Sequence, residues 1–183
     1  MSERTDIGVK VFEWWQKNLA PRTQSVSKDA AKSGKDETEK ASGQTAARTL
    51  SAKLRRGGFP DVLFEPAVHR LVHTLNVREY ELKRFCRLVE ILGSVRTHSQ
   101  STLAERLRGA DKEPLLSPLR FKQLMTAEDE ELATLLRRAV QIADYRCNVA
   151  ALARDVMFWN DRIKTRWCLD YFGAANNSEG KTE

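Results

Sequence analysis

The chain has 183 residues, of which 41% are hydrophobic and 31% charged, so it can form one globular domain or two small helical bundles that share a core. The formal net charge of +6 suits an anionic partner, although the excess is modest and says nothing about the fold. No apolar run approaches the length of a membrane span and the N-terminus lacks a secretory signal, so we expect a cytoplasmic protein without membrane contact.

Apolar residues at helical spacing predict helices through the first part of the chain, and no strand is predicted. The expected helices cover residues 11–19, 47–56, 66–75, 82–92 and 103–107. Residues 21–45 contain no large apolar side chain except Val26, so this segment is predicted to be a mobile loop. Gly57-Gly58 is a typical helix stop.

Three further helices joined by tight connections are predicted in the last third of the chain. Ser117-Pro118 is typical of a helix cap followed by proline at the first helical position. Thr126, followed by acidic residues, predicts the cap of the second helix, and Asn148 the cap of the third. In that third helix the apolar repeat continues without a break from Val149 to Trp167.

These elements predict an all-α fold, a bundle of about eight or nine helices in two packed halves. The N-terminal helical half is expected at residues 1–113 and the C-terminal helical bundle at residues 114–172. Short connections favour antiparallel neighbours within such a bundle. Residues 173–183 are small and polar and are predicted to form a disordered tail.

Lysines and arginines gather in small clusters that the predicted apolar faces leave on the surface. They are Arg48, Lys53, Arg55, Arg56, Arg120, Lys122, Arg137, Arg138, Arg162, Lys164 and Arg166. Guanidinium groups bind phosphate oxygens bidentately and release counterions, so these residues are candidates for holding a nucleic-acid backbone. For each cluster alone the alternative is a solvated helix face with local ion pairs, because acidic residues are interleaved.

The sequence contains no enzyme signature and no cofactor motif, so we expect no catalytic residue, no metal and no cofactor. His69 and His73 are four residues apart, which is half a zinc site without a third ligand, and a packed or partly exposed pair is the simpler interpretation. Cys86, Cys147 and Cys168 are far apart and without CxxC spacing, which favours reduced, unreactive thiols.

The four tryptophans could stack on bases, but three of them repeat with aliphatic residues at helical spacing. Trp15, Trp159 and Trp167 are therefore expected in the core. Trp14 lies off the apolar stripe of its helix and is the best candidate for an exposed ring at an interface.

A set of motifs follows in a defined order from about Val9 to Tyr171. They are Val11-Phe12-Glu13-Trp14-Trp15, Ala52-Lys53-Leu54-Arg55-Arg56, an R-F-x-x-L-M stretch at Arg120–Met125, Leu135-Leu136-Arg137-Arg138 after an acidic cap, and a closing helix at Ala153–Tyr171. In this order and spacing the chain resembles the CasB family, the small subunit of the type I-E CRISPR surveillance complex Cascade. The resemblance is weak between residues 61 and 113, and the 21–45 loop is longer than the family usually needs.

The resemblance implies a non-catalytic, all-helical protein of antiviral defence. Family members contact a second copy of themselves, the backbone and large subunits of Cascade, the guide RNA and both strands of the target DNA, and so stabilise the R-loop. By motif, Arg55, Arg56, Arg120, Arg137 and Arg138 are implied as nucleic-acid contacts, with Arg162, Lys164 and Arg166 as a basic last helix.

Other classes of protein also fit the sequence. A free-standing helical DNA-binding protein would need a helix-turn-helix and half-site spacing, and no compact signature of that kind stands out. A purely structural interaction protein would use the same charges on acidic protein partners, and weak salt dependence of nucleic-acid binding would favour it. A helical enzyme is the third possibility and would need a titratable constellation, which is not found.

Overall fold

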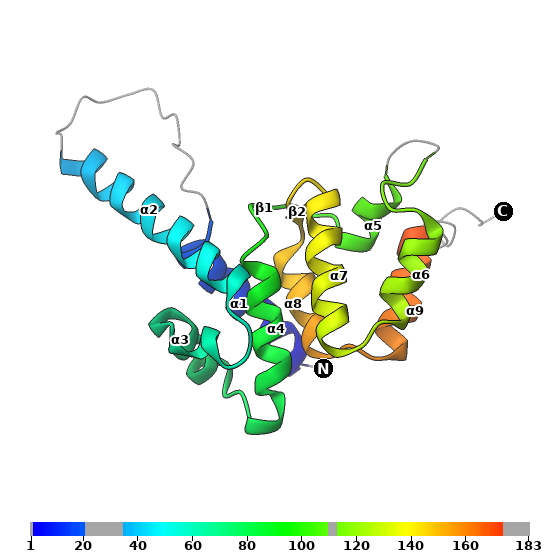
Figure 1. Cartoon of the computed structure of the whole chain (residues 1–183), viewed down its shortest axis with the longest axis horizontal. Coiled ribbons are helices and arrows are strands. Elements are labelled where there is room, and N and C mark those ends of the chain that lie inside the picture. Colours follow the sequence, from blue (N-terminus) through cyan, green and yellow to red (C-terminus); the bar gives the residue numbers. More distant parts are fainter. Residues whose placement is uncertain (1, 21–34, 110–112, 174–183) are drawn as a thin grey trace.

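The computed structural model describes residues 2–20, 35–109 and 113–173 and arranges them as a bundle of helices (Figure 1). The α-helices of these residues are α1 (Ser2–Asn18), α2 (Lys35–Arg56), α3 (Pro66–Leu75), α4 (Leu82–Leu92), α5 (Leu103–Arg108), α6 (Pro118–Thr126), α7 (Asp129–Ile142), α8 (Val149–Met157) and α9 (Asp161–Phe172). Short 3-10 helices, η1 (Asp61–Phe64) and η2 (Glu79–Glu81), precede α3 and α4. The prediction of an all-α helical bundle is confirmed.

Two very short strands, which the sequence did not predict, join the segment after α4 to the connection between α7 and α8. Strand β1 (Thr97–His98) pairs in parallel with β2 (Arg146–Cys147), and Thr97 lies opposite Arg146. Each strand has two residues, too few for the alternation of apolar and polar side chains that identifies a strand in a sequence.

Several helix boundaries follow the sequence signals. Prolines open α3 and α6, and the Asn148 side chain accepts a hydrogen bond from the Ala151 backbone N–H at 2.9 Å, as predicted. Thr126 is not a cap of α7, which is a correction. It is the last residue of α6, and its hydroxyl donates back to the Lys122 carbonyl at 3.1 Å, a bond that a helix interior offers to threonine.

The single helix predicted from Val149 to Trp167 is two helices, because α8 ends at Met157 and a non-helical connection leads to α9 at Asp161. The Asn160 side chain accepts a hydrogen bond from the Ile163 backbone N–H at 3.1 Å and so caps a new helix, α9. The apolar repeat runs through this break since both helices bury their apolar faces in the same core, so periodicity alone could not reveal it.

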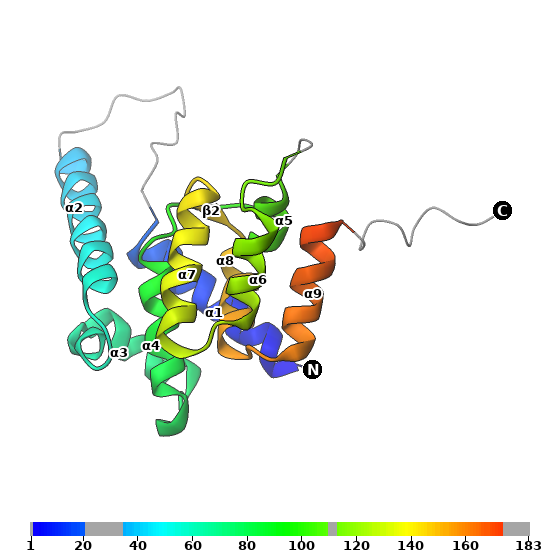
Figure 2. The same cartoon turned by 45° about the vertical axis from the view of Figure 1, so that its right-hand side comes forward.

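The predicted loop at residues 21–45 is also partly wrong, because α2 begins at Lys35. Residues 35–45 include two Lys, two Glu, one Ala and one Gln, which are good helix formers. Figures 1 and 2 show these first turns of α2 projecting from the body of the molecule. Residues 21–34 and 174–183 lie outside the described part of the chain.

One hydrophobic cluster connects the two sequence halves. Helix α1 packs along α8, α4 packs against α7 and α8, and α5 packs against α9. At Gly8 a Cβ would lie 2.8 Å from the Ala150 carbonyl oxygen, so the close approach of α1 to α8 requires glycine. The boundary at residue 113 stays a prediction, since helices from both sides of it build the same core.

The burial of the tryptophans differs from the prediction mainly at Trp14. Trp15 and Trp167 are buried as expected, and Trp159 is half-buried. The expectation of an exposed Trp14 is wrong, because its Nε1 donates to the Ala67 carbonyl at 2.8 Å and ties α1 to α3. Helix α1 packs against both α8 and α3, so it has a second buried side that a single apolar stripe does not predict.

A buried carboxylate joins the last two helices. Asp155 on α8 is 2% exposed and accepts a hydrogen bond from the Trp167 indole N–H at 2.7 Å. It also forms an ion pair with the guanidinium of Arg166 on α9. A buried charge of this kind is tolerated because two donors satisfy it.

We predict that Asp155→Ala lowers the free energy of unfolding by about 2 kcal/mol, because it leaves the buried Trp167 N–H without an acceptor. Urea unfolding followed by circular dichroism measures the effect. Glu131→Ala, at an exposed position on α7, is the control and should stay within about 0.5 kcal/mol of the wild type. Equal effects of the two substitutions would contradict a role of Asp155 in joining the helices.

The cysteines differ in accessibility. Cys86 and Cys147 are fully buried, and burial raises the pKa of their thiols to about 11 and about 12 respectively. Cys168 is half-buried. A thiol must ionise and meet the reagent before it reacts.

We therefore predict that iodoacetamide at pH 8 alkylates Cys168 first in the native protein. Cys86 and Cys147 should react only after denaturation, as mass spectrometry of tryptic peptides would show. Labelling of Cys147 in the native state at a rate similar to that of Cys168 would be inconsistent with this burial.

Candidate nucleic-acid interface

The end of α2 crosses the end of α4 at close range. At Gly93, directly after α4, a Cβ would lie 3.0 Å from the Leu54 Cβ and 3.2 Å from the Ser51 carbonyl oxygen. Leu54 is fully buried in this crossing. The contact between the two helices holds the exposed side chains of α2 beside the segment that follows α4.

Three arginines meet at a hollow beside this crossing, which we call the arginine hollow. It is lined by Leu19, Gln44, Ala47, Arg48, Ser51, Arg55, Gly93, Val95 and Arg96, and its volume is about 410 Å³. Arg48 and Arg55 come from α2, whereas Arg96 comes from the connection between α4 and β1. All three arginines are exposed and none of these lining residues is acidic, so the hollow favours an anion.

Arg96 is held by the turn that precedes β2. Its guanidinium carbon lies 4.0 Å from the centre of the Tyr145 ring, and its backbone N–H donates to the Tyr145 carbonyl at 2.9 Å. Asp144 and Tyr145 both have φ of 57°, a left-handed conformation that costs energy for these residue types. Sequence reasoning missed Arg96, because it lies in no cluster or motif and only the folded chain brings it beside α2.

Helix α7 joins the same surface through Arg137. Its guanidinium Nη1 donates to the Arg55 carbonyl at 3.0 Å, so it satisfies one of the free carbonyls at the end of α2. Beneath it, burial raises the pKa of Glu90 on α4, and the positive charge of Arg137 opposes that shift. Two motifs that are 82 residues apart in sequence therefore contact each other.

A second hollow lies between α6 and α7 and again carries two arginines. It is lined by Leu116, Arg120, Gln123, Leu124, Leu135, Arg138, Ala139 and Ile142, with a volume of about 290 Å³. Arg120 and Arg138 are exposed at its rim, above a largely apolar floor. The structure thus places Arg120 of the predicted R-F motif and Arg138 of the L-L-R-R motif at the same hollow.

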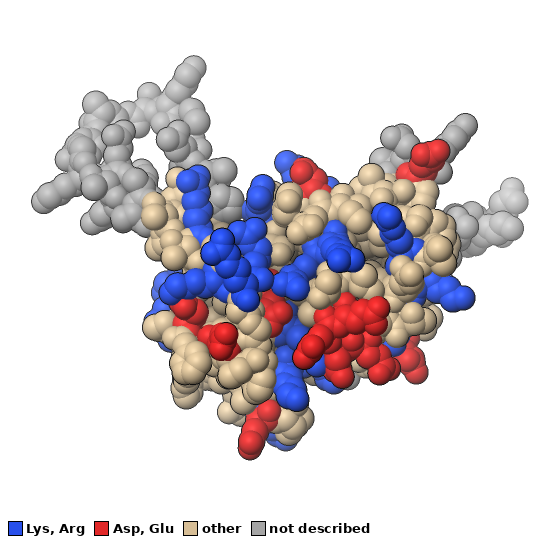
Figure 3. Space-filling model, in the orientation of Figure 1, with Lys and Arg blue, Asp and Glu red and all other residues tan. Residues whose placement is uncertain are grey.

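Together these residues form what we call the basic band. It comprises Arg48, Arg55, Arg96, Arg120, Arg137 and Arg138. In Figure 3 blue side chains cross one face of the molecule from α2 over α7 toward α6, with a red acidic patch below them at the start of α7. A row of arginines on one face is suited to contact with the phosphates of a nucleic-acid backbone.

The other predicted contact residues lie elsewhere or have internal partners. Lys53 pairs with Glu65 at 2.8 Å and shares a hollow with Arg56. Arg166 pairs with the buried Asp155. Neither the arginine hollow nor the second hollow includes the other three predicted residues, which are the exposed Lys122 and Arg162 and the half-buried Lys164.

The described residues offer no site for a metal. His69 and His73 are exposed and their ring centres are 6.0 Å apart. Within residues 2–20, 35–109 and 113–173 no group of three or more His, Cys, Asp or Glu side chains could hold an ion. In the same residues no helix combines the length and apolar character needed to span a bilayer.

Comparison with known proteins gives a consistent result. The family model described as CRISPR-associated protein Cse2 matches residues 50–172, which is more than half of the chain. The crystal structure of CasB from Thermus thermophilus is similar, with a TM-score of 0.57 and 23% identity over 75% of this chain and 94% of that one. Comparison with curated proteins gives no match.

A second crystal structure from Thermus thermophilus, that of a CRISPR-associated protein of the Cse2 family, has a TM-score of 0.56 and 24% identity, with 75% and 94% of the two chains covered. At such identities the structural similarity shows a common fold, and the family model adds the shared sequence pattern from the end of α2 to α9. The chain belongs to the Cse2 (CasB) family of CRISPR-associated proteins.

Proposed function

We propose that the chain is the non-catalytic small subunit of a type I-E CRISPR Cascade complex in antiviral defence. In this role it holds the backbones of the guide RNA–target heteroduplex and of the displaced DNA strand, and so stabilises the R-loop. Its other partners are the backbone and large subunits of the complex and a second copy of itself. The observation that carries the proposal is the basic band, because it collects arginines of three separate motifs on one face (Figure 3).

The chemistry of the band suits phosphate contacts. Arginine guanidinium groups bind phosphate oxygens bidentately, and the arginine hollow has no acidic lining residue to compete for them. Contacts of this type hold a strand without reading its sequence.

The energy required is small. Formation of an R-loop exchanges one duplex for another of similar stability, so protein contacts to the backbone tip the balance. Contacts worth about 1 kcal/mol each, from two or three arginines, shift the equilibrium by one to two orders of magnitude, since about 1.4 kcal/mol is tenfold. A subunit with a strip of cations and modest net charge is sufficient for this task.

We predict that removing arginines of the band weakens binding to nucleic acid and lowers its salt dependence. Arg48→Ala with Arg96→Ala removes two of the three arginines of the arginine hollow, and Arg120→Ala with Arg138→Ala removes both arginines of the second hollow. Each lost phosphate contact should lower the slope of log K against log salt by about 0.9 on duplex and about 0.7 on single strands. Fluorescence anisotropy with a labelled RNA–DNA hybrid and a labelled single strand measures these slopes.

Arg78→Ala with Lys83→Ala is the matched control, because it removes the same charge from exposed positions just before η2 and at the start of α4. The control should leave the slope unchanged. The same variants, reconstituted with the other subunits and guide RNA, should lower R-loop occupancy only for the band pairs. If band and control variants behave alike in both assays while the complex assembles, the proposed role of the band in holding the nucleic-acid backbone, the clamp role, is wrong.

A further prediction separates the clamp from a free-standing regulator. Two duplexes of equal length and unrelated sequence should bind with the same affinity at a fixed salt concentration, because phosphate contacts do not depend on the base. Competition titrations with genomic fragments would test this. A preference of about a thousandfold for one site would favour the regulator instead.

A further inference from the structure

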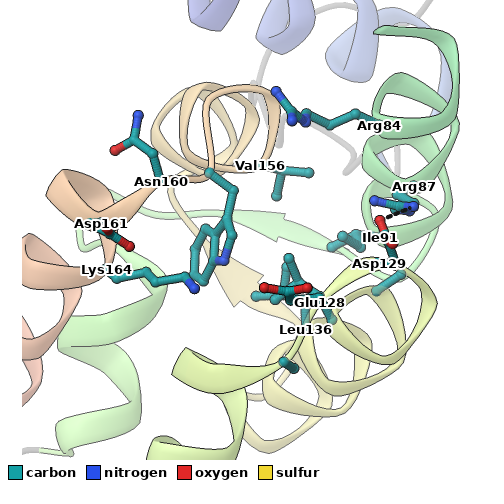
Figure 4. Close-up of a pocket in the computed structure, with 14 residues that line it drawn as sticks. Arg84, Arg87, Ile91, Glu128, Asp129, Leu136, Val156, Asn160, Asp161 and Lys164 are labelled. Carbon is teal, nitrogen blue, oxygen red and sulfur yellow. Dashed lines mark hydrogen bonds and ion pairs between the residues drawn. The ribbon is translucent and has the colours of Figure 1, made fainter. Parts of the chain in front are cut away.

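A pocket lies between α4, the start of α7 and the α8–α9 connection (Figure 4). It is lined by Arg84, Arg87, Ile91, Ala127, Glu128, Asp129, Leu132, Ala133, Leu136, Val156, Trp159, Asn160, Asp161 and Lys164, and its volume is about 320 Å³. None of these residues lines the arginine hollow or the second hollow. The pocket is therefore a separate surface from the basic band.

Buried apolar side chains form one part of the pocket wall. Ile91, Leu136 and Val156 are buried core residues that reach its wall from α4, α7 and α8. Trp159 adds an aromatic wall, and its ring is held edge-to-face against Trp167 with 5.2 Å between the ring centres. The volume is at the lower end for ligand pockets, which suits one anchoring side chain.

Trp159 also has an unused hydrogen-bond donor. Its Nε1 is buried and has no acceptor among the described residues. A buried donor without a partner costs free energy, which an acceptor on an incoming molecule would recover once a shift of the surrounding side chains opens a path to Nε1. The main-chain carbonyl of a peptide is an acceptor of the right kind beside an apolar anchor.

The pocket is lined by three acidic and three basic side chains, and the acids at the start of α7 continue onto the surface beyond it. Arg87 is paired with Asp129 at 2.6 Å, and Arg84 donates to the Met157 carbonyl at 3.0 Å, which holds its side chain on α8. Figure 4 shows Glu128, Asp161 and Lys164 together at this pocket. Glu128 and Asp161 are exposed and form no ion pair within the described chain.

Further acids extend the negative surface beyond the mouth. Glu130 and Glu131 are exposed on the next residues of α7, and Figure 3 shows a red acidic patch at the start of this helix. In and around the pocket five carboxylates therefore stand against the three cations Arg84, Arg87 and Lys164. Such a surface repels phosphates and attracts lysine and arginine.

We propose that this pocket docks a segment of a partner protein in which one apolar side chain is flanked by lysine or arginine. The apolar side chain fills the space beside Trp159, a main-chain carbonyl of the segment accepts the Nε1 hydrogen bond, and the flanking cations meet Glu128 and Asp161. A central apolar anchor in a pocket with a charged rim is the usual arrangement of a protein–protein hot spot. This site goes beyond the nucleic-acid clamp and does not depend on it.

The test uses a random heptapeptide library displayed on phage and panned against the full chain. Peptides with an apolar centre and basic flanks should be enriched on the wild type. Glu128→Lys with Asp161→Asn removes the acidic rim, and Ala133→Leu fills the pocket from α7. Glu79→Lys with Glu113→Gln is the control, because it makes the same change of charge at exposed positions outside the pocket.

The second readout is the indole N–H signal of Trp159 in the ¹⁵N-labelled protein, assigned with Trp159→Phe. A synthetic copy of an enriched peptide should shift this signal, and a thymidine oligonucleotide of about 20 residues, long enough to span a single-strand site, should not. Affinity should fall about tenfold or more in the rim variant and in Trp159→Phe, and should stay unchanged in the control.

The proposal is overturned if panning enriches no peptide of this kind, or if enriched peptides bind the rim variant and the control equally well. It is also overturned if the thymidine strand moves the Trp159 signal and the peptides do not, since the pocket would then bind nucleic acid. If Ala133→Leu does not fold, the rim variant and Trp159→Phe still test the proposal.

Discussion

The burial of α4 is the constraint on which both functional surfaces depend. From Phe85 to Leu92 almost every side chain of this helix is buried, against α7 and α8 on one side and α2 on the other. Arg84 and Arg87 line the pocket, whereas Gly93 lies in the arginine hollow. A helix packed this tightly cannot shift at one end alone, so the spacing of the two surfaces is fixed by the hydrophobic core.

Helix α7 separates the two kinds of charge. Its first turn carries Asp129, Glu130 and Glu131, and its later turns carry Arg137 and Arg138. The carboxylates in the first turn suit the positive end of the helix dipole and so also stabilise the helix. The acidic start borders the pocket and the basic part belongs to the band. One helix thus offers an acidic surface suited to a basic protein segment beside a basic surface suited to phosphates.

The sequence motifs identified some arginines of the candidate site, but they did not show which arginines lie together. Arg55 and Arg137 were predicted in separate clusters, and a hydrogen bond from the Arg137 side chain to the Arg55 carbonyl joins them. Arg96 was missed because it is brought to α2 by the crossing at Gly93 and by the turn at Tyr145, both of which are tertiary contacts. Arg166, by contrast, was predicted as a nucleic-acid contact, but its guanidinium forms an ion pair with the buried Asp155.

The sequence by itself determined the helical class, most helix positions and the apolar faces, because these follow from periodicity and from local caps such as Asn148. It also carried the motifs that identify the family. Only the tertiary structure decided where α8 ends and α9 begins, that Trp14 is buried, and which arginines share a face. The physical reason is that an exposed cation gains little from any one position along a helix, so its neighbours are set by how the helices cross.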